Sequence, residues 1–263
     1  MELLPTNKGN DSSRRFKRSS SVPLILSRLV RFPQMDFEFA LWQMAYLLIA
    51  PRRVYRNIYY HKQTKNQWAR DDPAFLVLLA SLLCLSAVAW GLVIGLGMMG
   101  ILRAMLFMVI VDFVLVGSIV ATFTWFVTNR FLSQSNMMTN DQRVEWAYAF
   151  DIHCNSFFPL FLILYVVQFF FLPLLIKSNW VCLIASNLVY LVSMTWYCYG
   201  TFLGFNVNNN EAVINYYYLV LPFLVHTELL LYPIISFIIG FIVLTVFGIN
   251  IGENVIGFYF GWS

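Results

Sequence analysis

The chain has 263 residues, of which 60% are hydrophobic and only 11% are charged, with a formal net charge of +4. Soluble domains carry about 25% charged residues, so this composition excludes an ordinary soluble enzyme or binding module and indicates a membrane protein. Five runs without any charged side chain support this conclusion, at residues 74–102, 113–129, 154–176, 178–210 and 229–252. A helix needs roughly 20 such residues to cross a bilayer, and a helix satisfies its own backbone polar groups in lipid.

The first thirty residues, 1–30, are rich in serine, asparagine and basic side chains, and they predict a disordered basic tail on the cytosolic side. A polybasic cluster, RRFKRSSS, lies within this tail. Such clusters attract anionic lipids at about 1 kcal/mol per basic residue. The alternative is a tail that only keeps the segment soluble and sets the orientation of the protein.

Residues 31–72 predict two amphipathic helices that lie at the cytosolic membrane interface. The apolar stretch from Phe39 to Ala50 is too short to span, and Pro51 ends or kinks its helix. The block that follows places four apolar and aromatic side chains on one helical face, next to three arginines: Val54, Tyr55, Ile58 and Tyr59, with Arg52, Arg53 and Arg56.

Residues 73–263 predict the membrane domain of an all-α polytopic protein with five transmembrane helices, at about 75–97, 104–127, 157–176, 180–203 and 230–250. Asp72 and Pro73 predict the start of the first span, because aspartate caps helices and proline suits their first turn. The apolar stretch 212–225 is too short to cross and predicts an interfacial or re-entrant segment.

Basic residues predict the orientation. Thirteen of the 17 Lys and Arg residues precede residue 74, together with six acidic residues, so this part carries a net charge of +7. The remainder has four basic and seven acidic residues, a net charge of −3. The positive-inside rule therefore predicts a cytosolic N-terminus, and five spans then put the C-terminus in the lumen.

The stretch VEWAYAFDIHCNSFFP, residues 144–159, contains several side chains that bind metals or move protons. On a helix, Asp151 and His153 are two positions apart and do not face each other. No further ligand follows at zinc spacing, so we expect no metal, no cofactor and no enzymatic activity. The stretch instead predicts the end of a cytosolic connection, 128–156, at headgroup level.

We expect the two N-terminal helices and this connection to form one basic and aromatic platform for anionic lipids and a cytosolic partner. Its predicted members are Arg52, Arg53, Tyr55, Arg56, Tyr59, Trp68, Trp146, Tyr148 and Phe150.

Asp112 lies within the second predicted span, where a carboxylate is costly and often functional. One hypothesis is that it joins helices by hydrogen bonds, with Gln168 or Asn187 as its partner. The alternative is that Asp112, Gln168 and Asn187 line the path of a transporter or channel. Motifs of hydrolases, metalloproteases and nucleotide-binding loops are missing. GLGMMG, at 95–100, has the spacing of a dinucleotide fingerprint but ends a span, so we reject that reading.

Three segments resemble the uncoordinated-fifty (unc-fifty homologue) family of eukaryotic Golgi membrane proteins: QMDFEFALWQM, RRVYRNIYYHKQTKNQWARDDPAFLVLL and VEWAYAFDIHCNSFFPL. The resemblance covers about residues 32–205. It implies a five-span, non-enzymatic protein of the Golgi or early secretory pathway, with a cytosolic N-terminus. It also implies a trafficking role, in surface delivery of client receptor subunits of the nicotinic acetylcholine receptor type and in recruitment of an Arf guanine-nucleotide exchange factor. A further role at the inner nuclear membrane, with RNA as the ligand, is attached to the same family.

Overall fold

The structure is a computed structural model that describes residues 35–65, 72–132, 144–175, 179–206 and 227–260. All regular elements in these ranges are helices. Five of them are long and apolar enough to cross a membrane: Ala74–Ile94, Met98–Leu132, Trp146–Pro173, Trp180–Phe205 and Glu228–Val246. The predicted all-α, five-span fold is therefore confirmed. The tail 1–30, Trp68 and the stretch 212–225 lie outside the described residues.

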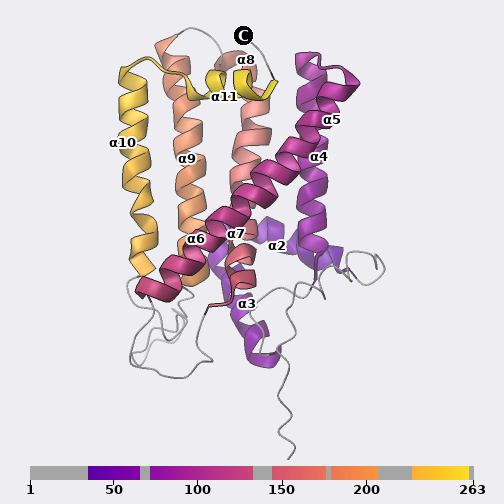
Figure 1. The fold of residues 1–263 in the computed structure, drawn as a ribbon, viewed down its shortest axis with the longest axis vertical. Coiled ribbons are helices and arrows are strands. Elements are labelled where there is room, and N and C mark those ends of the chain that lie inside the picture. The colour runs from indigo at the N-terminus through magenta and orange to yellow at the C-terminus, as the bar shows by residue number, and fades with distance from the viewer. Residues whose placement is uncertain (1–34, 66–71, 133–143, 176–178, 207–226, 261–263) are drawn as a thin grey trace, which may run out of the picture.

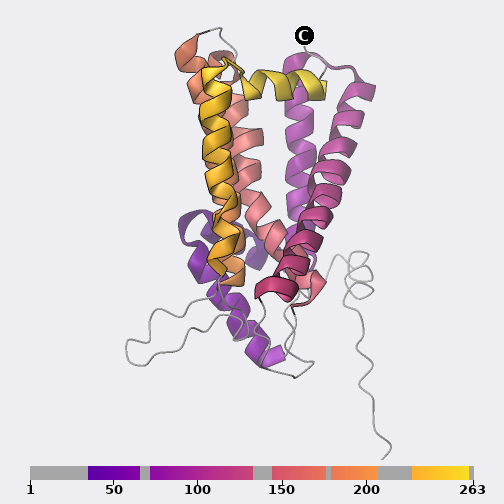
Figure 2. The same ribbon diagram turned by 60° about the vertical axis from the view of Figure 1, so that its left-hand side comes forward.

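The N-terminal and C-terminal helices lie at opposite ends of the bundle (Figure 1). Helices α2 (Phe37–Ile49) and α3 (Pro51–Lys65) lie at one end, which we call the N-terminal end. Helix α11 (Ile251–Phe260) lies across the other end of the bundle instead of running along the spans (Figure 2). An odd number of spans separates the two, so they lie on opposite faces of the membrane domain.

The first span, α4 (Ala74–Ile94), starts directly after the predicted pair Asp72 and Pro73. Asp72 Oδ1 accepts a hydrogen bond from the backbone N–H of Ala74 at 3.0 Å, so it caps the helix. Its other oxygen accepts from the N–H of Asp36 at 2.7 Å. One carboxylate therefore ties the start of the N-terminal helices to the start of the first span. The helix ends at Gly95, whose φ of 80° is the left-handed conformation that glycine favours.

The second span is one continuous helix, formed by α5 (Met98–Leu106), η2 (Phe107–Leu115), α6 (Val116–Val127) and η3 (Thr128–Leu132). Its 35 residues make a rod of about 50 Å at 1.5 Å per residue. The hydrocarbon layer is about 30 Å thick, so a helix this long has to tilt. Figure 1 shows it crossing the bundle diagonally.

The third span begins at Trp146, which lies inside the predicted connection 128–156, about three helical turns before its end, and this corrects the prediction. It consists of α7 (Trp146–Phe161), η4 (Leu162–Val167) and α8 (Gln168–Leu175). Twelve of the 16 residues of α7 are buried, which makes α7 a central helix of the fold. Sequence reasoning placed the start at 157 because the charge-free run begins only at 154, after Asp151 and His153. In the structure, neighbouring helices supply partners for His153 and Asn155.

Small residues let the fourth span, α9 (Trp180–Phe205), lie close to α7. A Cβ on Gly200 would lie 2.9 Å from Ser156 Oγ, and one on Gly204 would lie 2.7 Å from Ile152 Cγ2. These two glycines have the G-x-x-x-G spacing that allows close approach of membrane helices. The Tyr148 hydroxyl also reaches α9, where it donates to the Gly204 carbonyl at 2.7 Å.

The fifth span, η5 (Thr227–Leu231) with α10 (Pro233–Val246), is shorter than predicted and is followed by a helix that the sequence reasoning missed. Gly248, with φ 71°, turns the chain after α10. Asn250 Oδ1 then accepts from the Glu253 N–H at 3.2 Å and caps α11. The predicted end at residue 250 was therefore too late, because 247–250 form the turn.

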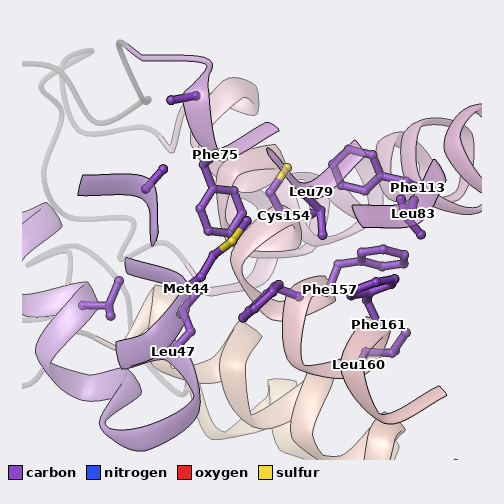
Figure 3. Close-up of a cluster of buried hydrophobic side chains, with 14 of the residues drawn as sticks. Met44, Leu47, Phe75, Leu79, Leu83, Phe113, Cys154, Phe157, Leu160 and Phe161 are labelled. Atoms are coloured by element: carbon purple, nitrogen blue, oxygen red, sulfur yellow. The ribbon is translucent and has the colours of Figure 1, made fainter. Parts of the chain in front are cut away.

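The main hydrophobic core joins α2 to the spans (Figure 3). Met44 and Leu47 of α2 lie beside Phe75 of α4 and Phe158 of α7. A buried polar contact reinforces this junction, since the Gln43 amide donates to Asn155 Oδ1 at 3.0 Å. Helix α2 is thus a fixed part of the membrane domain.

Candidate functional site

A cavity of about 380 Å³ lies inside the bundle, between the second, third and fourth spans and under α11. Each span contributes one stripe of side chains at helical spacing. The second span contributes Met108, Asp112, Val116 and Val120; the third contributes His153, Phe157, Leu160, Leu164 and Gln168; the fourth contributes Tyr190, Met194 and Tyr197. Cavities that bind small molecules measure about 300–1,000 Å³ and are mostly apolar with a few polar groups, as this one is.

Asp112 supplies the carboxylate of the cavity, and its partners are two tyrosines. Its Oδ2 accepts a hydrogen bond from the Tyr165 hydroxyl at 2.9 Å and one from the Tyr259 hydroxyl at 2.6 Å. The prediction that Gln168 or Asn187 pairs with Asp112 is therefore wrong. Sequence reasoning missed Tyr259 because it lies on α11, after the last predicted span.

Tyr259 lies outside the five spans and closes the cavity from the C-terminal end. Burial raises the pKa of its hydroxyl above the ordinary value for tyrosine, and the hydrogen bond to Asp112 acts in the same direction. The hydroxyl therefore keeps its proton near neutral pH and remains a donor. Its ring also contacts Phe107, with centroids 5.3 Å apart.

Asp112 and Tyr165 both lie on π-helical segments, η2 and η4. Such segments widen a helix locally, and they occur frequently at functional sites. In η4, the Tyr165 carbonyl accepts a hydrogen bond at 2.9 Å from the indole N–H of Trp90 on α4. Asp112 and its partner Tyr165 therefore both lie on π-helical turns, and Trp90 holds the second of these turns.

His153 lies at the opposite end of the cavity, and both of its ring nitrogens have partners. Nδ1 lies 2.8 Å from the Tyr197 hydroxyl, and Nε2 lies 3.3 Å from the Phe113 carbonyl. Its ring rests against Gly117, where a Cβ would collide with it. His153 is therefore a buried packing residue of α7. Among the residues that the structure describes, no three His, Cys, Asp or Glu side chains gather as a metal site.

The structure separates the other two intramembrane polar residues. Gln168 lines the cavity and donates to the Tyr190 hydroxyl at 3.1 Å. Asn187 lies elsewhere on α9 and holds the turn before α11. Its amide nitrogen donates to Thr245 Oγ1 at 3.2 Å and to the Ile249 carbonyl at 3.0 Å, and its Oδ1 accepts from the Ile251 N–H at 2.9 Å. Asp112 and Gln168 therefore share the cavity, and Asn187 fastens the helix that covers it.

The structure divides the predicted platform into exposed and buried side chains. Arg52 and Arg53 are exposed at the start of α3, and the Arg53 guanidinium lies 5.3 Å from the centre of the Tyr46 ring. Arg56 is half-buried, whereas Tyr55 is only 2% exposed. The expectation that α3 presents Tyr55 to a partner is corrected, since this ring anchors α3 in the main core. The helix backbone includes Tyr59, but the description of side chains ends before it.

The three aromatic residues of α7 also differ from the expectation. Tyr148 is buried against α9. The Phe150 ring stacks on the Trp146 ring and lies at a tilt to the His153 ring. Trp146 is the most exposed of the three, at 36%, and its indole N–H donates to Thr122 Oγ1 on α6 at 2.9 Å. The described contacts therefore attach Trp146 to α6 and Arg53 to α2, rather than joining both in one platform.

Fold and cavity together define a multi-pass helical membrane protein whose N-terminal helices are built into the bundle and whose last helix covers an intramembrane cavity. The model of the UNC-50 family matches residues 25–260. The chain belongs to this family.

Its relatives carry the same family name. It is 45% identical to "Protein unc-50 homolog" of Dictyostelium discoideum, over 99% of this chain and 100% of the relative. It is 43% identical to the Homo sapiens protein of that name, over 89% of this chain and 85% of the relative. It is 44% identical to the Danio rerio protein, over 89% of this chain and 86% of the relative. These names denote no enzymatic activity. No solved structure matches the chain.

Proposed function

We propose that this chain is a non-enzymatic trafficking adaptor of Golgi and early secretory membranes, which supports surface delivery of receptors and recruits an Arf guanine-nucleotide exchange factor. The family resemblance supports this role. The structural observation that connects this role to particular residues is that Arg52 and Arg53 are exposed at the N-terminal end of the bundle. We call Arg52, Arg53 and the half-buried Arg56 the arginine surface.

The helix turn that carries the arginine surface is anchored in the core, which favours a docking role. Val54 and Tyr55, between these arginines, are 1% and 2% exposed and lie in the main core. The contact of Arg53 with the Tyr46 ring further restricts its side chain. A surface that is already ordered loses little conformational entropy on binding, and arginines are frequent hot spots of protein interfaces.

The charge of the chain supports the orientation that this role requires. The part before residue 74 carries a net charge of +7, so the positive-inside rule favours its retention in the cytosol. Anionic lipids of the cytosolic leaflet then attract the same basic residues. In this orientation the arginine surface faces cytosolic factors, and α11 lies on the luminal side.

Client receptor subunits meet a different surface, the lipid-facing side of α10. An apolar stripe at helical spacing is exposed there: Ile235, Ile239, Ile242 and Val246. A Cβ on the neighbouring Gly240 would touch nothing within 4 Å, so there is room beside this stripe. In this proposal the transmembrane segments of a client lie against α10.

Proximity labelling from the N-terminus in intact cells tests the function. The proposal expects strong labelling of the Arf exchange factor and of Golgi coat and receptor proteins. Labelling confined to the lumen would contradict the orientation. Labelling dominated by nuclear-envelope and RNA-binding proteins would favour the inner nuclear membrane role, and it would contradict the adaptor.

A second candidate function, transport of a small solute or ion, draws on one observation: Asp112 and Gln168 lie in the same cavity. A transport path needs water-lined polar groups on both sides of such a site, whereas the described lining between Asp112 and His153 is mainly apolar, for example Val116 and Leu160. Flux through purified protein in liposomes, lost in Asp112→Asn, would favour transport over the adaptor.

A further inference from the structure

We propose that the cavity is a binding site for a single-chain membrane amphiphile with an ammonium head, whose amine lies at Asp112 and whose apolar chain lies between the second, third and fourth spans. This proposal does not depend on the adaptor function. Three features support it: the unused hydrogen-bond acceptor of the Asp112 carboxylate, the apolar stripes of the cavity walls, and the cover that α11 forms.

The carboxylate has an unused acceptor. Both tyrosine hydroxyls donate to Oδ2 of Asp112, at 2.9 Å and 2.6 Å. Oδ1 receives no hydrogen bond from any residue that the structure describes. The described lining contains no Lys or Arg, and the ring nitrogens of His153 and the amide nitrogen of Gln168 are already engaged. Ionisable residues inside a membrane pair with one another or with backbone groups; the described lining offers no cation to Asp112, so we infer that a ligand supplies it.

An ammonium group is the head that fits this position best. It is a strong donor, and its hydrogen bonds to a carboxylate are about twice as strong as those between neutral groups. The two tyrosine hydroxyls leave Oδ2 saturated, so one further donor at Oδ1 completes the site. A carboxylate head would be repelled by Asp112, and a neutral alcohol would leave the charge of Asp112 without a counter-ion.

The remaining walls fit an alkyl chain. Val116 and Val120 on α6 face Phe157, Leu160 and Leu164 on the third span. Val116 is also 45% exposed, so the cavity meets the outer surface of the bundle beside α6, where a lipid can enter. The side away from lipid is closed by Trp90 and Phe260, whose rings stack 5.6 Å apart.

The size of the cavity selects against larger occupants. A helix about 10 Å across takes up about 420 Å³ for each turn, so a cavity of about 380 Å³ holds no transmembrane helix of a client. At about 30 Å³ for a water-sized group, the cavity accommodates about a dozen such groups. This matches most of one alkyl chain, and it leaves no room inside the cavity for the second chain of a phospholipid.

Helix α11 makes the site a covered one. Tyr259 brings its hydroxyl to the carboxylate from above, and the three hydrogen bonds of Asn187 hold the turn from which α11 starts. Gly252 fits this cover to its support, because a Cβ there would collide with Ser186 Oγ and lie 3.1 Å from Gln168 Nε2. The head of the ligand is therefore separated from the aqueous phase by one helix.

Photo-crosslinking of the full-length protein in nanodiscs tests the proposal. The probes are octadecylamine, octadecanol and stearic acid, each with a diazirine in mid-chain and a terminal alkyne. We expect saturable labelling by the amine only, in peptides of α6 and of the third span. Unlabelled sphingosine, a single-chain amine, should compete, and phosphatidylethanolamine should not.

Two variants locate the head and the chain. Asp112→Asn keeps the shape and should reduce amine labelling about tenfold, since it removes the charge from the head site. Leu164→Trp fills the chain site and leaves the carboxylate in place, and it should abolish labelling. Ser118→Ala, on the exposed face of α6, is the matched control and should label as the unchanged protein does.

Other outcomes would overturn the proposal. Equal labelling by amine and alcohol, full labelling of Leu164→Trp, or labels spread evenly over the lipid-facing helices would each show that the amine is not bound in the cavity. Better competition by phosphatidylethanolamine than by sphingosine would contradict a single-chain ligand. The comparison of the three probes uses the unchanged protein, so it decides the question even if a variant does not fold.

Discussion

The Tyr259 hydroxyl donates a 2.6 Å hydrogen bond to Asp112 Oδ2, across 147 positions of the chain. This bond joins the last helix to the middle of the second span. The carboxylate of Asp112, inside the membrane domain, is thereby hydrogen-bonded to α11, the helix that lies across one end of the bundle. The stability of this arrangement depends on the turn between α10 and α11, which Asn187 holds.

Asn187→Leu should loosen α11. The substitution removes three hydrogen bonds and leaves the Ile249 carbonyl without its amide donor. At about 0.6 kcal/mol for each hydrogen bond in a membrane protein, we expect a loss of roughly 2 kcal/mol, seen as a lower midpoint of thermal unfolding in detergent. Leu188→Ala, at the neighbouring exposed position, is the control. An unchanged midpoint in Asn187→Leu would show that the turn does not depend on this amide.

Gly117→Ala should displace His153, because the added methyl group would occupy the position of its ring. The ring would lose its contacts with the Tyr197 hydroxyl and the Phe113 carbonyl. We expect a destabilisation of about 1–3 kcal/mol, as for overpacked cores. Gly240→Ala, with no atom within 4 Å of the new methyl group, should be neutral or slightly stabilising.

A double-mutant cycle separates this collision from a general effect of alanine. His153→Ala removes the ring, so adding Gly117→Ala to it should cost much less than in the unchanged protein. Additive effects of the two substitutions on the unfolding midpoint would contradict the close contact between Gly117 and His153.

Gln43→Leu should weaken the attachment of α2. Asn155 is 1% exposed, and the substitution leaves its Oδ1 without the Gln43 amide. Loss of one hydrogen bond to a buried polar group costs about 0.5–1.5 kcal/mol. Adding Asn155→Leu should restore part of the stability, since two apolar side chains then meet. Protease cleavage between α2 and α4, faster in the single variant than in the double, would follow this change; equal rates in all three proteins would contradict it.

The orientation of the chain in the membrane can be tested without any substitution in the hydrophobic core. The chain contains the glycosylation sequon Asn10-Asp11-Ser12 in its N-terminal tail. A glycosylation acceptor on a polar extension added after Ser263 should be modified and Asn10 should remain bare, because five spans separate a cytosolic N-terminus from a luminal C-terminus. Modification at Asn10 would reverse the orientation, and with it the side that the arginine surface faces.

The five spans could be predicted because charge-free runs of sufficient length are a direct consequence of the bilayer. The capping role of Asp72 followed equally well from local chemistry. The start of the third span could not be predicted, because the polarity of His153 and Asn155 is satisfied by Tyr197, Phe113 and Gln43, which are distant in the sequence. A short-range pattern contains no information on such partners.

The candidate site was predicted in part. Sequence reasoning singled out Asp112 because a carboxylate inside a membrane span is energetically costly, and the structure shows that Gln168 lines the same cavity. Tyr259 was missed because α11 is too short to span and follows a glycine turn that breaks the apolar pattern. The G-x-x-x-G spacing of Gly200 and Gly204 was a signal that could have indicated the contact between α7 and α9. The prediction that Tyr55 lies at the surface was wrong, because the pattern of an amphipathic helix does not tell whether its apolar face packs against lipid or against protein.

The measurement that tests the central claim most directly is the fraction of the Arf exchange factor bound to Golgi membranes in cells whose only copy of the protein carries Arg52→Glu and Arg53→Glu. Both side chains are exposed, so we expect the variant to fold, to insert correctly and to reach the Golgi. Arg103→Glu, an exposed arginine on α5 near the C-terminal end, is the control. The account predicts loss of the bound exchange factor to the level of cells without the protein, with normal binding in the control. Normal binding with the correctly oriented double variant would contradict it.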